Sequence, residues 1–195
     1  MKSLISLFSL LISFTVIANK SSTAAEEIPE DLDGNSIDPF NVSDGNTIVL
    51  VFAGVDCPIS NRYVPAINRL YKNYGSKNFS FWIIYPGSYF DSKEVESHLK
   101  EYQIKAPALI DRKGYLVKKT GATVTPEVAV YAPSSGNSLP ENWIYRGRID
   151  NRYTDFGKWR AEPSREDLKE VLQSIADGQR PETRETQAIG CYIVE

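Results

Sequence analysis

The sequence predicts an α/β domain with a central mixed β-sheet flanked by helices. Two continuous runs of apolar and β-branched residues, 47–53 and 79–85, are typical of strands that are buried on both faces. Each run is followed by a stretch in which apolar residues recur at helical spacing, at 58–74 and at 91–102. A later alternating strand and a final helix complete the pattern, which favours a mixed rather than a purely parallel sheet.

The first predicted helix begins directly after the turn that follows the first strand. Pro58 suits the first helical position, where the backbone needs no amide donor, and Gly75 ends the helix. Pro65 lies in the interior, where proline removes a backbone hydrogen bond. We therefore expect a helix over 58–74 with a kink near its middle.

The remaining elements are recognised by their caps and by short apolar runs. The helix at 91–102 has Asp91 at its cap position and Glu94 three residues later. The final helix, 164–176, is expected to begin with Ser164 as its cap. Short strands are predicted at 108–110, 128–131 and 143–149, and a short helix at 115–120.

The start of the chain has the pattern of a secretory signal peptide. Residues 1–25 combine a positively charged start, an apolar run and an ending of small residues at Thr23-Ala24-Ala25. The alternative is an uncleaved membrane anchor, but the apolar run is shorter than the roughly 20 residues that span a bilayer. We expect cleavage, and hence a protein exported to a periplasm or secreted.

Three further regions follow the signal segment. Residues 26–46 are acidic and rich in Pro, Gly, Asp and Asn, which indicates a linker or loose N-terminal arm. Residues 47–178 hold the predicted strands and helices and are long enough for one domain with its own core. Residues 179–195 form a tail without clear periodicity, and this tail carries Cys191.

Composition and charge exclude several functional classes. Removal of residues 1–25 takes away Lys2 and Lys20 and no acidic residue, which leaves 20 basic and 25 acidic side chains and a net charge of −5. Nucleic-acid binding requires clustered Lys and Arg, so no nucleic-acid partner is expected. One histidine and two cysteines are too few for an imidazole-based or structural zinc site. We expect no metal and no cofactor, and membrane contact only if the signal segment stays uncleaved.

Cys57 lies at the turn between the first buried strand and the first helix. Thiol chemistry requires the thiolate, and a helix N-terminus lowers a thiol pKa through its unpaired amides and its positive dipole end. The alternative is a small buried core cysteine, which is common in globular proteins. The position at a strand-to-helix turn favours a reactive thiol.

These residues resemble the thioredoxin-like superfamily. Residues 52–60, which contain Cys57, are followed by Pro65 eight positions after the cysteine, as in thioredoxins. Val124-Thr125-Pro126 resembles the superfamily loop in which a proline, usually cis, faces the active cysteine. The segment PALIDRKGYLVKKTGA is most similar to redoxins of the alkyl hydroperoxide reductase and thiol-specific antioxidant type. The resemblance implies a thioredoxin-like fold, a nucleophilic Cys57, and a site shaped by Thr125 and Pro126.

The chain departs from these families at several positions. Ser60 stands where a dithiol enzyme has its second cysteine, and a CxxS motif can attack a disulfide but lacks the usual fast exchange within one motif. Gly54 stands where peroxiredoxins typically have threonine. Peroxiredoxins also use an arginine to hold the thiolate and the peroxide. Arg146 and Arg148, which strand alternation would place on one face, are candidates for it, as is Arg62 in the helix.

Cys191 offers a second thiol far along the chain. It is similar in place to the C-terminal cysteine of two-cysteine peroxiredoxins, which resolves a sulfenic acid or mixed disulfide on the first cysteine. A structural disulfide with Cys57 and a thiol used between chains are the alternatives. Pairing requires that the two Cα atoms lie within about 7 Å.

Three polar residues have both a functional and a structural interpretation. Asp56 could raise the pKa of the Cys57 thiol or transfer its proton, or it could help to cap the helix. Glu127 could be a proton relay, or a solvated loop carboxylate. His98 lies beside the apolar stripe of its helix and is expected at the surface or at an edge.

The sequence therefore predicts an exported thiol oxidoreductase that acts on disulfides or peroxides, with Cys57 as nucleophile. Its partners would be a disulfide-bearing protein or a peroxide substrate, and an external thiol reductant. A binding module that holds a partner through Cys57 without turnover is the alternative, which Ser60 favours because CxxS can trap but not release efficiently. In a third interpretation, Cys57 and Cys191 form only a stabilising disulfide.

Overall fold

The computed structural model describes residues 28–41, 46–131, 143–182 and 184–194. The expected signal peptide, residues 1–25, lies outside the described residues. Within the described part, no helix combines the length and apolar character that crossing a membrane requires.

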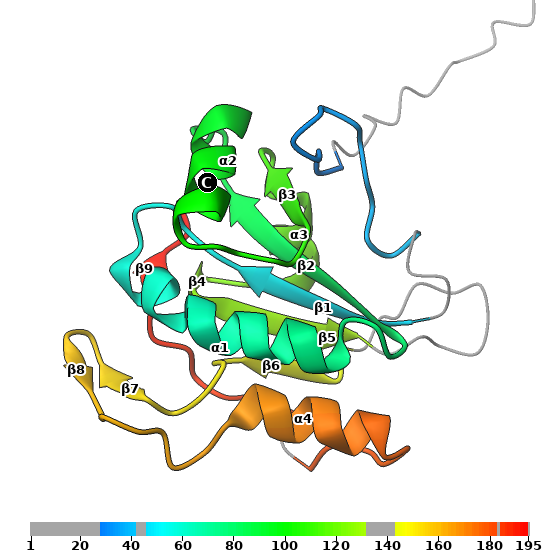
Figure 1. Cartoon of the computed structure of the whole chain (residues 1–195), viewed down its shortest axis with the longest axis vertical. Coiled ribbons are helices and arrows are strands. Elements are labelled where there is room, and N and C mark those ends of the chain that lie inside the picture. The colour runs from blue at the N-terminus through cyan, green and yellow to red at the C-terminus, as the bar shows by residue number, and fades with distance from the viewer. Residues whose placement is uncertain (1–27, 42–45, 132–142, 183, 195) are drawn as a thin grey trace, which may run out of the picture.

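A five-stranded mixed sheet forms the centre of the domain, in the order β3-β2-β1-β5-β6 (Figure 1). β1, β2 and β3 pair in parallel, whereas β5 runs antiparallel to β1 and β6 antiparallel to β5. The predicted mixed sheet is confirmed. Its strands are β1 (Thr47–Phe52), β2 (Phe79–Pro86), β3 (Ala108–Asp111), β5 (Glu127–Tyr131) and β6 (Tyr145–Gly147).

Helices cover both faces of this sheet (Figure 1). α1 (Pro58–Tyr74), α2 (Ser92–Glu101) and α4 (Asp167–Ala176) contribute to the core on one face, and α3 (Tyr115–Thr120) packs on the other. α1 connects β1 to β2 and α2 connects β2 to β3, as parallel neighbours require a crossover.

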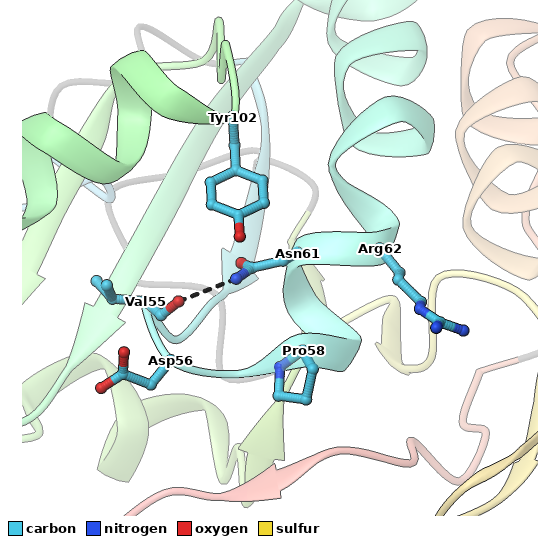
Figure 2. A pocket seen from close by; sticks show the side chains of 6 residues that line it. All are labelled: Val55, Asp56, Pro58, Asn61, Arg62 and Tyr102. Atoms are coloured by element: carbon cyan, nitrogen blue, oxygen red, sulfur yellow. Dashed lines mark hydrogen bonds between the residues drawn. The ribbon is translucent and has the colours of Figure 1, made fainter.

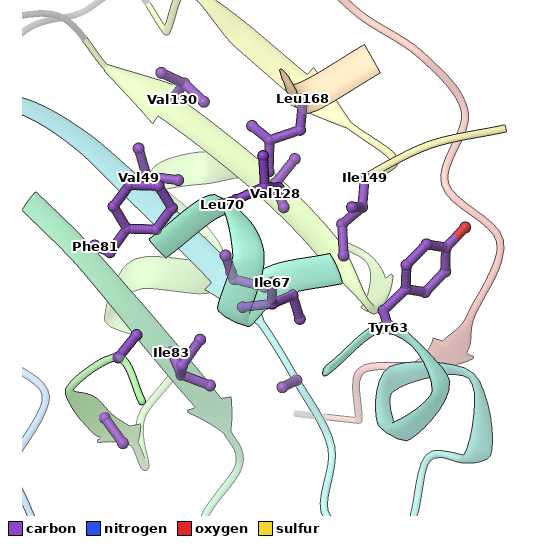
Figure 3. Close-up of a cluster of buried hydrophobic side chains, with 14 of the residues drawn as sticks. Val49, Tyr63, Ile67, Leu70, Phe81, Ile83, Val128, Val130, Ile149 and Leu168 are labelled. Atoms are coloured by element: carbon purple, nitrogen blue, oxygen red, sulfur yellow. The ribbon is translucent and has the colours of Figure 1, made fainter. Parts of the chain in front are cut away.

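The alternation of side chains along the strands divides the core between the two faces. In β1, Val49 points to the face of α1 and α4, and Leu50 points to the face of α3. Figure 3 shows the first cluster, in which strand side chains such as Phe81 and Val128 gather with Ile67 of α1 and Leu168 of α4. Because both faces of the central strands are covered, these strands read as continuous apolar runs.

The first two helices are placed as their sequence signals predict. α1 has Pro58 as its first residue and Gly75 as its C-cap, and Pro65 lies inside it. α2 is capped by Asp91, whose carboxylate accepts a hydrogen bond from the Glu94 backbone N–H at 2.7 Å.

The final helix begins later than predicted, at Asp167 instead of Ser164. The side chain of Asn151 engages Ser164 on both sides: it accepts from the Ser164 backbone N–H at 2.9 Å and donates to the Ser164 hydroxyl at 2.8 Å. Ser164 therefore closes a loop instead of capping α4. A local sequence pattern does not reveal this competing partner thirteen residues away.

The N-terminal arm expected over 26–46 is attached to the domain in its described part, residues 28–41, and is not loose there. Glu30 and Ile110 exchange backbone hydrogen bonds at 3.1 and 2.8 Å, so the arm extends the edge of β3. Phe40 packs edge-on against Tyr131 with ring centroids 5.0 Å apart. The arm covers a strand edge that would otherwise present unpaired backbone groups.

The tail covers the opposite edge of the sheet. Arg146 of β6 donates its backbone N–H to the Arg184 carbonyl at 2.9 Å and accepts from the Thr186 N–H at 3.0 Å. A side chain at Gly147 would overlap Thr186, so this close approach of the tail requires glycine. The strand predicted at 143–149 is accordingly short, and the tail continues from β6 toward the start of α1 (Figure 1).

Replacement of Leu168 by alanine should test the contribution of α4 to the core. Leu168 is fully buried against the sheet, so Leu168→Ala should lower the free energy of unfolding by about 2–5 kcal/mol. Urea denaturation followed by circular dichroism measures this change. Lys169→Ala, at an exposed neighbouring position, should change it by no more than about 0.5 kcal/mol, and equal effects of the two substitutions would contradict the packing.

Candidate functional site

Cys57 lies just beyond the carboxyl end of β1, at the N-cap of α1. The connecting turn is held at both ends: the Ala53 N–H donates to the Ile84 carbonyl at 2.8 Å, and the Cys57 N–H donates to the Gly54 carbonyl at 3.2 Å. Only 3% of Cys57 is exposed. The thiol is therefore fixed just below the surface, at the positive end of the helix dipole.

Two elements surround the Cys57 sulfur. From α1, the Ser60 backbone N–H points at the sulfur at 3.4 Å. From the facing loop, the Thr125 carbonyl accepts a hydrogen bond from the thiol at 3.0 Å. The Thr125–Pro126 peptide is cis, as the resemblance of this loop implies, and it lies directly against the cysteine.

The tail brings a second sulfur to the same place. β4 (Val124–Thr125) pairs antiparallel with β9 (Cys191–Tyr192), and Cys191 lies opposite Thr125. The Cys191 thiol is within hydrogen-bonding reach of the Cys57 sulfur, and both cysteines are free thiols. Two residues 134 positions apart in the chain thus form one thiol pair.

The pKa values of the two thiols are shifted in opposite directions. Burial alone would raise the pKa of Cys57, but hydrogen bonds from the Cys191 thiol, from Ser60 and from Thr125 outweigh it and bring the pKa below its ordinary value. Burial raises the pKa of Cys191 to about 12, and the hydrogen bond and charge of Cys57 act in the same direction. When the pair loses one proton, the negative charge therefore forms on Cys57 and the remaining proton stays on Cys191.

Ser60 and Gly54, which replace the cysteine and the threonine of related enzymes, help to fix the turn around the Cys57 sulfur. The Ser60 hydroxyl accepts a hydrogen bond from the Gly54 N–H at 3.4 Å, which ties the turn to the first turn of α1. A Cβ on Gly54 would lie 3.1 Å from the Thr125 hydroxyl oxygen and 3.2 Å from the Cys57 Cβ. The space of a residue-54 side chain is thus filled by Thr125, which itself donates to the Cys57 sulfur.

Arg146 and Arg148 do not reach Cys57, which corrects the expectation that one of them supports the thiolate. Arg146 forms an ion pair with Glu185 and donates to the Thr120 carbonyl at the end of α3. Arg148 binds Asp167 of α4 at 2.8 Å. The two arginines lie toward opposite faces of the sheet because β6 ends at the residue between them, so strand alternation does not continue.

Glu127 is buried, and its carboxylate holds the loop before Thr125 instead of facing the thiol. It accepts hydrogen bonds from the backbone N–H groups of Thr123 and Val124 at 2.8 and 3.3 Å, and it lies 4.0 Å from Arg146. The side chain follows β5 onto the α3 face of the sheet, away from Cys57. The interpretation of Glu127 as a proton relay therefore has no contact to support it.

An open pocket of about 480 Å³ lies at the turn before α1 and at the first turn of that helix, where its lining includes Asp56, Pro58 and Arg62 but not Cys57 (Figure 2). Asp56 and Arg62 give it one negative and one positive side chain, and both are exposed. The guanidinium of Arg62 lies 4.5 Å from the ring centre of Trp159, in the hairpin formed by β7 (Tyr153–Asp155) and β8 (Lys158–Trp159). Asp56 does not cap α1, since the cap is Cys57 itself.

His98 is buried, which corrects its expected place at the surface. Its ring nitrogens lie 2.8 Å from the Tyr85 hydroxyl and 2.8 Å from the Asn61 side-chain oxygen. Asn61 in turn donates to the Val55 carbonyl at 3.0 Å, as the dashed line in Figure 2 shows. One signal in the sequence points to this burial: His98 follows Val95 by three residues and so lies on the buried face of α2.

The network connects β2 and α2 to the turn that precedes Cys57. Burial lowers the pKa of His98, and the carboxylates of Glu101 and Asp56 offset this only in part. His98 is accordingly neutral near pH 7 and fixes the turn through hydrogen bonds, not through charge. Among the described residues, no group of three or more His, Cys, Asp or Glu side chains could hold a metal ion.

Substitution of Cys191 should change the titration of Cys57. In the native protein the apparent pKa of Cys57 should lie below the ordinary value of about 8.5. Cys191→Ala removes the main donor to the sulfur and should raise this pKa, whereas Cys191→Ser keeps a hydroxyl donor and should raise it less. The rate of alkylation of Cys57 by iodoacetamide as a function of pH measures it. Identical profiles in all three proteins would show that Cys191 does not tune Cys57.

Stability should fall on mild acidification because of His98. Its pKa is lowered in the folded state, so the unfolded chain binds more protons below the unfolded value of about 6.5. The free energy of unfolding should therefore be constant above that pH and decrease by up to about 1.4 kcal/mol per pH unit below it. Urea midpoints at pH 7.5 and 5.5 measure the effect, which His98→Gln should reduce because the chain has no other histidine.

The chain resembles known proteins both in its sequence and in its fold. The Redoxin family model matches residues 18–132, more than half of the 195 residues. A hypothetical protein from Sinorhizobium meliloti matches in structure with a TM-score of 0.70 at 20% identity, covering 85% of this chain and 88% of that one. An uncharacterised conserved protein from Geobacillus kaustophilus also has a TM-score of 0.70, at 22% identity and coverages of 87% and 89%.

A thioredoxin-like protein from Aeropyrum pernix has a TM-score of 0.50 at 18% identity, covering 63% of this chain and 81% of its own. At these identities the structural matches show the fold alone. A search of curated proteins found no match. The family model, the thioredoxin-like fold and the cysteine at the start of α1 agree with one another: the chain belongs to the Redoxin family of thiol oxidoreductases.

Proposed function

We propose that the protein is an exported two-cysteine thiol oxidoreductase, in which Cys57 is the nucleophile and Cys191 resolves the oxidised intermediate. The observation that carries the proposal is the thiol pair itself. Cys191 lies opposite Thr125, whose carbonyl contacts the Cys57 thiol, and the pKa is lowered at Cys57 and raised at Cys191. Such a division of roles suits a nucleophile that is ionised first and a second thiol that acts afterwards.

The first step is attack by the Cys57 thiolate. With a peroxide, the sulfur attacks one oxygen, the O–O bond breaks, and the leaving hydroxide or alkoxide takes a proton; Cys57 becomes a sulfenic acid. With a disulfide, the sulfur attacks one sulfur of the S–S bond and a thiolate leaves. The donors from Ser60 and Thr125 remain on the sulfur in the reactant state and hold it in place.

The second step uses Cys191. Part of the increase in its pKa comes from the charge of Cys57 and from the hydrogen bond to it. Once Cys57 is oxidised this charge is gone, so Cys191 loses its proton more readily. Its sulfur attacks Cys57, water or a thiolate leaves, and a Cys57–Cys191 disulfide forms. An external thiol reductant then restores both thiols in two exchange steps, and Cys191 is the more exposed target.

The place of Cys191 also answers the argument for a non-catalytic binding module. That argument rests on Ser60, which leaves the CxxS motif without a second thiol of its own. Cys191 supplies the missing thiol from the tail, against the same sulfur. The lowered pKa of Cys57 supports a reactive pair over a disulfide that serves stability alone.

The proposal of export rests on residues 1–25, whose pattern is typical of a cleaved signal peptide. In the oxidising compartment that export implies, two adjacent thiols form a disulfide and need a dedicated reductant. The proposal thus includes a thiol-bearing partner in the same compartment.

Mass spectrometry after a brief, limiting dose of hydrogen peroxide tests the proposal. The native protein should lose two hydrogens, because Cys57 and Cys191 join. The Cys191→Ser variant should instead gain one oxygen as a sulfenic acid on Cys57, which a dimedone probe traps. Treatment of the native protein with a thiol reductant should restore the starting mass.

Cys57→Ser is the matched control and should show neither change at this dose. The catalytic proposal fails if Cys57 stays a free thiol in both the native protein and Cys191→Ser. It also fails if the protein is isolated with a Cys57–Cys191 disulfide that mild reductants do not open.

A further inference from the structure

The edge of β4 beside Cys57 is filled by the chain's own tail. Thr125 pairs with Cys191 and Val124 with Tyr192, and the Ile193 N–H donates to the Thr123 carbonyl at 3.0 Å. A free strand edge binds extended segments of other chains through its backbone groups. Here the groups nearest the nucleophile already have a partner.

Gly190 sets how closely the tail approaches the site. A Cβ at this position would overlap the Thr125 carbonyl oxygen and lie 3.1 Å from the Pro126 nitrogen. Any side chain would therefore push the tail away from the Thr125–Pro126 peptide. Because position 190 is glycine, the tail backbone lies directly on the peptide that flanks Cys57.

The access of an oxidant to the Cys57 sulfur therefore depends on the size of the oxidant. A disulfide within an extended protein segment needs room for its backbone along β4 and for its sulfur next to Cys57. β9 and the Cys191 thiol occupy both places. A peroxide has only two oxygen atoms to bring to the sulfur and needs no strand edge.

We propose that Gly190 and β9 determine substrate specificity by closing the β4 edge, an inference that rests on the proposed function. With this edge closed, reduced Cys57 reacts with small peroxides and does not react with disulfides in extended protein segments. β9 occupies this edge as a cysteine-containing peptide from another chain would. It is short, and Tyr192 is 84% exposed, so one substitution should suffice to displace it.

Two variants with the same thiol content test this proposal. Cys191→Ser keeps the tail strand in place, and Cys191→Ser with Gly190→Val displaces it. The probes are hydrogen peroxide and a synthetic peptide with the tail's own sequence, Ala-Ile-Gly-Cys-Tyr-Ile, activated as a mixed disulfide with thionitrobenzoate. The Cys57 thiolate attacks the peptide sulfur, the S–S bond breaks, and coloured thionitrobenzoate leaves.

The measured quantity is the ratio of the two second-order rate constants, peptide over peroxide. Both reactions use the same thiolate, so a change in the ionised fraction of Cys57 cancels in the ratio. Displacement of the tail should raise the ratio by about tenfold or more, since the peptide gains the backbone hydrogen bonds that β9 gives up. Faster hydrogen exchange of the Ile193 amide should confirm that the tail has moved.

An equal ratio in the two variants, with the tail displaced, overturns the inference and leaves the proposed function intact. If Cys57 of Cys191→Ser reacts with neither probe, the proposed function itself fails. Should Gly190→Val prevent folding, a chain that ends at Gln187 serves as the second displaced form. It keeps Thr186, which holds the preceding part of the tail through the Tyr145 hydroxyl at 2.7 Å.

Discussion

A sulfur that is to carry charge below the protein surface must receive its hydrogen-bond donors from the fold, because water does not reach it in sufficient amount. Cys57 meets this constraint with a backbone amide from α1, a hydroxyl from the loop before Pro126, and the thiol of Cys191. The donors come from three separate parts of the chain. The turn after β1, the cis-peptide loop and the tail therefore all meet at the Cys57 sulfur.

The two segments that lie outside the α/β core both cover its edges. The arm covers the edge of β3, and the tail covers the edge of β6 before it reaches β4. Covered edges protect a sheet from pairing with other chains. In this domain the same cover delivers Cys191 to Cys57, so protection of the sheet and completion of the site depend on the same strand pairing.

Local signals in the sequence predicted the strands of the central sheet, α1 and the place of Cys57 at the start of α1. These features depend on neighbours within a few residues, such as a cap, a proline or an apolar run. Other features depend on partners far away in the sequence. These are the contacts of Arg146, the burial of His98 and the position of Cys191 beside Thr125. One sequence offers several partners for each of these groups, and only packing selects among them.

The separation of 134 positions from Cys57 to Cys191 couples the chemistry of the site to the stability of the domain. A bond between the two sulfurs encloses most of the fold in one covalent loop. In the chain-entropy model, closing a loop of this size lowers the conformational entropy of the unfolded state, which destabilises that state by about 4–5 kcal/mol. Linkage works in both directions: the oxidised form resists unfolding more than the reduced form, and a folded chain holds its disulfide more tightly than an unfolded one.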